Sequence, residues 1–303
     1  MLQLEEVEKP TVKDKQLLIR VKANSANPAD WHTMRGTPHF IRLSSGLFKP
    51  KQKILGADFA GIVEEIGPGV SKFKVGDRVY GEEYESGAFA EYVCSSEDVC
   101  GPMPESSGFE EMAAVPIAGL TALQALDTHG KLKKGESVLI NGSSGGVGHF
   151  CIQIAKAYGA SHVAAVCSNR NVEFVKSLGA DEVIAYDKTD IHSHQGKYDL
   201  VIDNHGNLFF EDYKRMGKRG VVIGFTGMGH MIMVLLKNAF SKFQLAQFTA
   251  QSNTHDLTRL ADLISKGRIK PHIEKSYPYT QIPEAIGYIE AMRTRGKVTM
   301  IWE

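Results

Sequence analysis

A glycine-rich turn between an apolar run and a helical pattern is the feature of this chain best suited to chemistry. Residues 138–140 are apolar, and Ser143, Gly145 and Gly148 follow with the G-x-G-x-x-G spacing, with a serine in place of the first glycine. Backbone N–H groups and the helix dipole at a helix N-terminus favour a bound phosphate. Gly145 would let the backbone approach the phosphates, and Gly148 would let the helix pack against the strand. The predicted pyrophosphate contacts are Ser144, Gly145, Gly146 and Val147.

The end of the next strand indicates which dinucleotide binds. Residues 162–167 form an apolar run typical of a buried strand. An NAD site places an acidic residue about 20 residues after the glycines, where it binds the ribose 2′-hydroxyl. Here Ser168 and Arg170 follow the strand, and no acidic residue comes before Glu173. A hydroxyl and a guanidinium suit a 2′-phosphate, so these residues predict NADPH. Alternatively, Arg170 is an ordinary solvated residue that opens a helix.

Further apolar runs extend this pattern. Residues 181–186, 198–204 and 220–225 alternate with helical segments, which predicts a doubly wound α/β fold with a parallel sheet covered on both faces. Ligands bind at the carboxyl ends of such strands. The candidate cofactor residues there are Asn204, His205, Gly224 and Phe225.

Composition excludes several classes of protein. The chain has 303 residues, of which 43% are hydrophobic, enough for two sizeable cores. Lys and Arg balance Asp and Glu at 35 each, without a long basic run, so we expect no nucleic-acid partner. The spacing of the four cysteines fits no disulfide framework, and no secretory signal is visible, which indicates the cytoplasm. The apolar run 231–236 is too short to span a bilayer and predicts a subunit or domain interface.

The N-terminal third has a different pattern. Short β-rich segments punctuated by glycine cover residues 17–23, 59–67, 76–81 and 87–93. They predict a barrel-like domain, which would form a substrate cleft beside the nucleotide-binding sheet. The predicted division assigns residues 1–110 and 254–303 to this domain and 111–253 to the dinucleotide-binding domain.

Motifs along nearly the whole chain carry a family resemblance. They are Asn27-Pro28-Ala29-Asp30, Gly56-Ala57-Asp58-Phe59-Ala60-Gly61, Val75-Gly76-Asp77-Arg78-Val79-Tyr80-Gly81, Gly87-Ala88-Phe89-Ala90-Glu91-Tyr92, Ala113-Ala114-Val115-Pro116, Gly119-Leu120-Thr121-Ala122, Gly145-Gly146-Val147-Gly148, Leu178-Gly179-Ala180-Asp181 and Arg295-Gly296-Lys297-Val298. On these motifs the chain resembles the zinc-free medium-chain dehydrogenase/reductases of the quinone oxidoreductase-like (zeta-crystallin-like) branch. The resemblance implies a Rossmann domain, a GroES-like catalytic domain and a homodimer formed through the sheet edge. Family members begin with an extra strand before the equivalent of Leu2, so either the start lies upstream or the first strand is missing.

The positions of the family's zinc ligands differ in this chain. Zinc-dependent relatives carry a Cys near position 27 and a Gly-His-Glu near position 56, where this chain has Asn27 and Gly56-Ala57-Asp58. A catalytic zinc needs three protein ligands. A structural zinc lobe needs four cysteines, and only Cys94 and Cys100 lie in the appropriate region. We therefore expect no metal.

A metal-free site favours an electrophilic hydride acceptor. A simple ketone needs strong polarisation, whereas quinones, enones and enals delocalise the added electrons onto oxygen, where modest hydrogen bonds stabilise them. Asn27 is the candidate for orienting substrate or nicotinamide, or else it holds the turn before Pro28. His32 is a candidate proton donor or a residue of the cleft edge. Asp30 is expected to be a structural hydrogen-bond acceptor, and Tyr80 a core residue.

The resemblance also implies cofactor contacts with alternatives. Thr121 would lie near the nicotinamide or its ribose, or would cap a helix. Tyr186 would lie beside the adenosine ribose phosphate, or in the core. Lys297 would reach the cofactor, or would be a surface charge.

The predicted function is NADPH-dependent hydride transfer to a quinone or an α,β-unsaturated carbonyl. One alternative is an NADPH-binding structural or regulatory protein without turnover. A zinc-free alcohol dehydrogenase is the less favoured third possibility.

Overall fold

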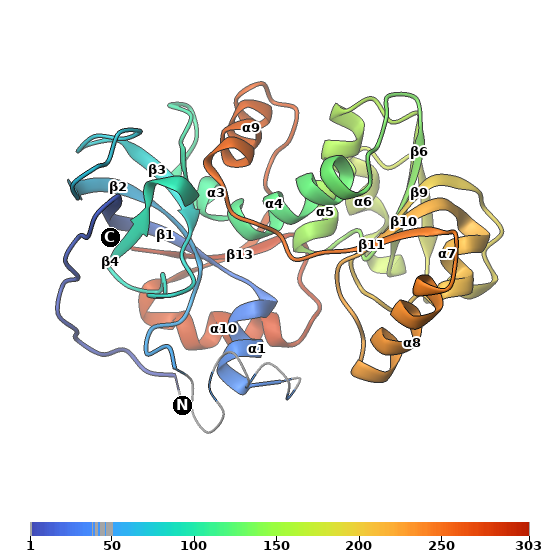
Figure 1. The fold of residues 1–303 in the computed structure, drawn as a ribbon, viewed down its shortest axis with the longest axis horizontal. Helices are drawn as coiled ribbons and strands as arrows, with labels where there is room; N and C mark the ends of the chain where they lie inside the picture. Colours follow the sequence, from blue (N-terminus) through green and yellow to red (C-terminus); the bar gives the residue numbers. More distant parts are fainter. Residues whose placement is uncertain (1, 38, 40–41, 43–45, 47–50, 303) are drawn as a thin grey trace. The chain divides into compact units, whose positions relative to one another are not determined.

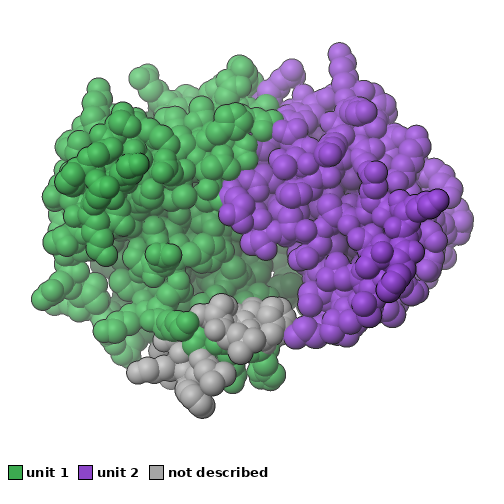
Figure 2. Space-filling view, in the orientation of Figure 1, with its two compact units in different colours: residues 1–120, 252–267, 271–303 green, residues 121–251, 268–270 purple. Residues whose placement is uncertain are grey.

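The computed structural model describes residues 2–37, 39, 42, 46 and 51–302. Its internal contacts divide the chain into two units, which Figure 2 colours separately. Unit 1 comprises residues 1–120, 252–267 and 271–303, and unit 2 comprises residues 121–251 and 268–270. Both ends of the chain therefore contribute to unit 1. The predicted division, with boundaries at residues 110 and 253, stays a prediction about domains.

In its described residues, unit 1 contains a seven-stranded sheet. Its strands are β1 (Gln16–Ala26), β2 (Asp58–Ile66), β3 (Arg78–Glu82), β4 (Tyr92–Ser96), β5 (Cys100–Pro102), β12 (Ile273–Pro278) and β13 (Lys297–Ile301). They follow the order β12-β13-β1-β2-β3-β5, with β4 also paired to β1. Leu17, Ile19 and Val21 alternate along β1 and bury one face of that strand in the core. The last strand of the chain, β13, thus pairs with the first (Figure 1).

The prediction of a strand at residues 87–93 is wrong for most of that segment. Residues 87–93 were expected to be a strand, but β4 begins only at Tyr92. Gly87 has a φ of +78°, and a Cβ there would overlap the backbone carbonyl of Ile54. The segment before Tyr92 is therefore a tight connection that glycine permits, and its alternating apolar pattern reflects burial of Ala88 and Phe89.

Helices cover the unit 1 sheet. They are α1 (Pro28–Arg35), α3 (Phe109–Ala113), α9 (Thr254–Ser265) and α10 (Ile282–Glu290), together with the first part of α4 (Pro116–Gln124). Ile282, Ile286 and Ile289 of α10 repeat at helical spacing and pack in one cluster with Val298 and Met300 of β13. Tyr80 is fully buried, as expected for a core residue, and its hydroxyl donates to the Leu257 carbonyl at 2.5 Å.

Unit 2 is a six-stranded parallel sheet with helices, which confirms the predicted doubly wound pattern. Its strands are β6 (Ser137–Asn141), β7 (His162–Cys167), β8 (Glu182–Ala185), β9 (Tyr198–Asp203), β10 (Gly217–Val222) and β11 (Gln244–Gln247), in the order β11-β10-β9-β6-β7-β8. Its helices are α5 (Gly146–Ala157), α6 (Val172–Ser177), α7 (Phe210–Met216) and α8 (Met228–Ala239). The strand order reverses beside β6, which is where doubly wound sheets bind ligands.

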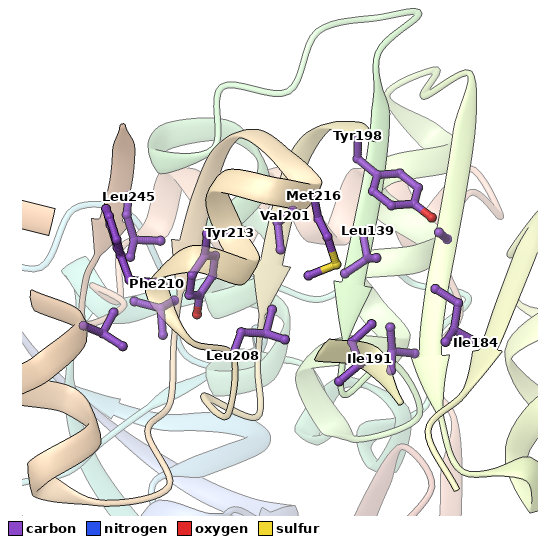
Figure 3. Close-up of a cluster of buried hydrophobic side chains, with 14 residues drawn as sticks. Leu139, Ile184, Ile191, Tyr198, Val201, Leu208, Phe210, Tyr213, Met216 and Leu245 are labelled. Carbon is purple, nitrogen blue, oxygen red and sulfur yellow. The ribbon is translucent and has the colours of Figure 1, made fainter. Parts of the chain in front are cut away.

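Apolar side chains from the strands and from α7 form the core of unit 2. Leu139 and Val201 of the central strands pack with Leu208, Tyr213 and Met216 (Figure 3). The strands read as continuous apolar runs because helices cover both faces of a parallel sheet.

The predicted interface segment 231–236 lies within α8. Val234 is the buried residue of this helix, whereas Ile232 is 49% and Leu236 56% exposed, and Phe240 just beyond is 91% exposed. Ile232, Leu236 and Phe240 are four residues apart and so lie on one face. Among the described residues, no helix is long and apolar enough to cross a membrane.

Candidate functional site

The glycine turn joins β6 to α5 in unit 2. Gly142 has a φ of +74°, and Gly145 is the N-cap of α5. A Cβ at Gly148 would overlap the backbone of Gly142 and Ser143, whereas the nearest atom to a Cβ at Gly145 is 3.8 Å away. Gly148 is therefore required by close packing of the helix on the turn that follows the strand. Gly145 leaves open space at the helix N-terminus.

Serines hold this turn against the neighbouring strand. The backbone N–H and Oγ of Ser143 both donate to the Val166 carbonyl of β7, at 3.0 and 2.9 Å. The Ser144 Oγ accepts a hydrogen bond from Asn171 Nδ2 at 2.9 Å. The serine that replaces the first glycine is thus a structural anchor. Gly146 and Val147 open α5, where the first N–H groups have no partner within the helix and can bind an anion.

The predicted 2′-phosphate residues follow two adjacent strands. Cys167 of β7 pairs with Ala185 of β8, and the Tyr186 N–H donates to the Cys167 carbonyl at 3.0 Å. Ser168 and Arg170 continue from β7, and Arg170 is exposed. Tyr186 is 57% exposed, so the alternative that it is a core residue is wrong. The structure brings these three residues to one end of neighbouring strands.

Sequence reasoning missed an acidic residue at this place. The Asp187 carboxylate accepts a hydrogen bond from the Asn169 backbone N–H at 2.8 Å. Asp187 follows the third strand rather than the second, so only the pairing of β7 with β8 brings it beside the Ser168–Arg170 segment. A carboxylate at this place would repel a 2′-phosphate.

The residues after β9 and β10 meet beside the glycine turn. Asn204 donates to the Asn141 carbonyl through both its backbone N–H, at 3.1 Å, and its Nδ2, at 3.0 Å. A Cβ at Gly142 would lie 3.5 Å from the Cβ of Asn204 and 3.6 Å from that of His205. A Cβ at Gly224 would lie 3.0 Å from the Asn204 carbonyl oxygen. Phe225, by contrast, packs partly against the unit 2 core.

A buried carboxylate organises this end of the sheet. Asp203, which is fully buried, accepts hydrogen bonds from Asn141 Nδ2 and from the Gly206 N–H, both at 2.7 Å, and from the Tyr213 hydroxyl at 2.8 Å. It fixes the loop that carries Asn204 and His205. Its position at the end of an apolar strand was the available sequence signal, which the prediction did not use.

Unit 1 contains a buried polar cluster around Asp58, the first residue of β2. Its Oδ2 accepts from the Ser25 Oγ and from Asn27 Nδ2, each at 2.8 Å. Its Oδ1 accepts from the Ile117 backbone N–H at 3.0 Å, near the start of α4. Asp58 has no exposed surface, and these three donors compensate the burial of its charge.

Lys297 completes the cluster from the other end of the chain. Its Nζ donates to Asn27 Oδ1 and lies 3.3 Å from Asp58 Oδ2. Lys297 is 3% exposed, so the alternative that it is a surface charge is wrong. The structure thus brings together two predicted site residues, Asn27 and Lys297, and adds Asp58 and Ser25.

Two more carboxyl groups lie near this cluster. Asp30 accepts from the Asn27 backbone N–H at 2.7 Å, as expected of a structural acceptor, and burial raises its pKa to about 7. Glu82 is opposite Asp58 in the register of β2 and β3. Burial, with the negative charges of Asp58 and Asp30, raises the pKa of Glu82 to about 8. Sequence reasoning missed Glu82 because only the strand pairing brings it to Asp58.

His32 and Thr121 have other surroundings. The His32 ring stacks on Trp31, with centroids 3.7 Å apart, and its Nδ1 contacts the Thr37 carbonyl at 2.5 Å. Because a carbonyl only accepts, Nδ1 carries a proton. Thr121 is 7% exposed and lies inside α4, so it does not cap the start of that helix. In the part of the chain that the structure describes, no group of three His, Cys, Asp or Glu residues is placed to hold a metal.

Comparison with known proteins identifies the family. Residues 13–105 match the "Alcohol dehydrogenase GroES-like domain" family, and residues 178–299 match the "Zinc-binding dehydrogenase" family. The chain belongs to the medium-chain dehydrogenase/reductase family and has its GroES-like and Rossmann folds, as the motifs predicted.

Its relatives include quinone oxidoreductases. The chain is 36% identical to the "Chloroplast envelope quinone oxidoreductase homolog" of Arabidopsis thaliana, over 91% of this chain and 86% of that protein. It is 32% identical to the "NADPH-dependent alkenal/one oxidoreductase, chloroplastic" of the same plant, over 96% of this chain and 73% of that protein. The solved quinone oxidoreductase of Coxiella burnetii superimposes with a TM-score of 0.86 at 30% identity, covering 98% of this chain and 93% of that one.

Proposed function

We propose that the protein transfers hydride from NADPH to a quinone or an α,β-unsaturated carbonyl without a metal. One observation carries this proposal. Where zinc-dependent relatives have a metal ligand, the Asn27 amide is bound to Lys297 and Asp58. Ala57 replaces a second ligand, so the residues present do not provide a zinc site.

The nucleotide turn fits the cofactor. The Cβ-free surface at Gly145 and the N–H groups at the start of α5 suit a pyrophosphate. Ser168 and Arg170 would bind the 2′-phosphate, with Tyr186 beside the ribose, and an NADPH-dependent relative supports this choice. The other proposed contacts are Thr121, Ser144, Gly146, Val147, Asn204, His205, Gly224 and Phe225.

The proposed substrates match a site without a Lewis acid. Bound NADPH supplies the hydride from its nicotinamide. A quinone or enone spreads the incoming charge onto oxygen, so hydrogen-bond donors suffice to stabilise it. The relatives include a quinone oxidoreductase homolog and an alkenal/one oxidoreductase, which supports these acceptor classes. Asn27 is proposed to orient the reactants, and His32 remains the candidate proton donor.

We also propose a cytoplasmic homodimer. β11 is one of the two terminal strands of the unit 2 sheet, and the exposed face of α8 precedes it in sequence. An unpaired strand edge and a row of exposed apolar side chains are both typical of a subunit interface. All four cysteines are free thiols, which supports a reducing compartment.

The test of the activity is oxidation of NADPH by a panel of quinones, enals, enones and simple ketones, with zinc measured in the purified protein. Turnover with quinones or enones, but not with ketones, is expected. Tight NADPH binding without turnover across the panel would instead support a binding protein. One zinc per chain would overturn the metal-free mechanism.

A further inference from the structure

The partners of the Asn27 amide fix which way it points. One side faces the Lys297 ammonium, which can only donate, so the Asn27 atom there is Oδ1. The other side faces the Asp58 carboxylate, which can only accept, so the atom there is Nδ2, at 2.8 Å. Nδ2 also donates to the Ser25 carbonyl at 3.3 Å. Both N–H groups of the amide are therefore used within the protein.

Among the described residues, one lone pair of Asn27 Oδ1 has no partner, and Asn27 is 2% exposed, so only a group that reaches this buried position can use that lone pair. An amide oxygen has two lone pairs, and Lys297 occupies one of them. Asn27 can thus accept a hydrogen bond from a ligand hydroxyl or N–H group but cannot donate one to a developing oxyanion. If Lys297 were absent, the amide could turn and present its N–H groups instead.

We propose that Lys297 is a positioning residue for the hydride transfer, acting through Asn27 by holding the amide with its oxygen as the acceptor for a donor group of the bound reactants. This inference rests on the proposed function. It assigns Lys297 a role other than the direct cofactor contact that the resemblance implied.

The strand register explains why Lys297 meets Asn27. Ala26, the last residue of β1, pairs with Val298 of β13 in antiparallel register, so Asn27, which follows Ala26, lies opposite Lys297, which precedes Val298. Gly296, with a φ of +63°, precedes Lys297, whose own N–H donates to the His272 carbonyl at 2.8 Å. The backbone therefore holds Lys297 independently of its side chain.

The charge of Asp58 explains why a lysine stands there. The carboxylate already accepts three hydrogen bonds, from Ser25, Asn27 and Ile117. A buried carboxylate still needs a counter-charge, and Lys297 Nζ is 3.3 Å away. The same ammonium thus neutralises Asp58 and orients Asn27.

A double-mutant cycle separates a positioning role from direct cofactor binding. The variants are Lys297→Met, Asn27→Ala and the two combined, with Lys275→Met, an exposed lysine of the neighbouring strand β12, as the control. We expect Lys297→Met to lower kcat about tenfold or more while the KM for NADPH changes less than about twofold. The combined variant should be no slower than Asn27→Ala alone. The inference would be overturned if the combined variant lost kcat by the product of the two single losses. It would also be overturned if Lys297→Met raised the KM for NADPH and left kcat unchanged.

Lys297→Arg covers the case in which Lys297→Met does not fold. The arginine keeps the charge beside Asp58 but replaces the ammonium by a planar fork. We expect kcat to fall when this change is made in the wild-type protein and not when it is made in Asn27→Ala. An equal fall in both backgrounds, or no fall in either, contradicts a role through Asn27. If no quinone or enone supports NADPH oxidation by the wild-type protein, the proposed function is wrong. This inference then fails with it, before any variant is made.

Discussion

Glu82 and Asp58 face each other across strands β2 and β3, and the Lys297 ammonium lies 3.3 Å from the Asp58 carboxylate. Burial and the nearby carboxylates raise the pKa of Glu82 to about 8 and that of Asp30 to about 7. Ionising all three carboxyl groups would leave excess negative charge inside the domain. The native protein therefore holds protons on Asp30 and Glu82 that the unfolded chain releases at lower pH.

This proton uptake predicts that stability falls as pH rises. Exposed carboxyls titrate near pH 4, so between roughly pH 4 and 8 the native state binds more protons than the unfolded state. The contribution of Asp30 is lost by about pH 7 and that of Glu82 by about pH 8. Thermal unfolding between pH 5 and 8 should show a falling Tm, and Glu82→Gln should flatten the upper part of the slope. Glu85→Gln, at an exposed position, is the control and should leave the slope of Tm against pH unchanged. If Glu82→Gln has the same slope as the wild-type protein, Glu82 is not the group that takes up the proton.

Arg170 and Asp187 predict opposite effects on cofactor choice. Arg170→Asp should raise the KM for NADPH far more than that for NADH, because it removes a positive charge from the proposed 2′-phosphate site. Asp187→Asn should lower the KM for NADPH, while its amide oxygen can still accept from the Asn169 N–H. Steady-state kinetics with both cofactors measures these changes. If neither variant alters the ratio of the two KM values, the 2′-phosphate site is wrongly placed.

Two glycines of the nucleotide turn form a matched pair. In Gly148→Ala the new methyl overlaps the backbone of Gly142 and Ser143, so we expect a loss of about 1–3 kcal/mol of stability. In Gly145→Ala the nearest atom is 3.8 Å away, so the fold should be unaffected. The methyl would nevertheless occupy the space of the pyrophosphate and weaken NADPH binding. Denaturant unfolding and NADPH titration distinguish the two, and a Gly145→Ala protein with wild-type affinity would exclude this turn as the phosphate site.

The parallel sheet was predictable because its strands are continuous apolar runs separated by helical patterns. The predictions for 162–167 and 198–204 match β7 and β9 to within a residue or so. The segment 87–93 was misread because burial of Ala88 and Phe89 imitates the alternation of a strand, while the glycine at position 87 turns the chain. The local pattern of apolar residues indicates which side chains are buried. It does not indicate which backbone groups form hydrogen bonds with a neighbouring strand.

The sequence named candidate site residues one by one, but it showed which of them lie together only where they are close in sequence. Ser144, Gly145 and Gly146 lie in one turn, and their arrangement follows from that turn. Asn27 and Lys297 are 270 positions apart, and their contact depends on the pairing of the first and last strands. The neighbours of Asp187 and Glu82 could not be inferred from the sequence for the same reason, since the pairing of strands sets which residues lie beside them.

Removing the charge of Lys297 should also lower the free energy of unfolding substantially. Lys297→Met would leave the Asp58 charge buried without its counter-ion, which costs about 3–5 kcal/mol. Adding Asp58→Asn removes that charge while keeping a side chain of the same shape, so the double variant should recover part of the lost stability. Urea unfolding of the single and double variants measures the recovery. A double variant less stable than Lys297→Met would show that Asp58 does not depend on the ammonium.

The exposed face of α8 predicts a change in oligomeric state. Ile232 and Leu236 are 49% and 56% exposed in the isolated chain, so replacing both by lysine costs little within the subunit. In the proposed homodimer the same lysines would place charges at an apolar contact, and the protein should dissociate to monomers. Light scattering coupled to size-exclusion chromatography reports the mass, and circular dichroism should show an unchanged fold. Val75→Lys, at an equally exposed apolar residue of unit 1, is the control. A double-lysine variant that remains dimeric would locate the interface elsewhere, because two buried ammonium groups in each subunit could not be tolerated there.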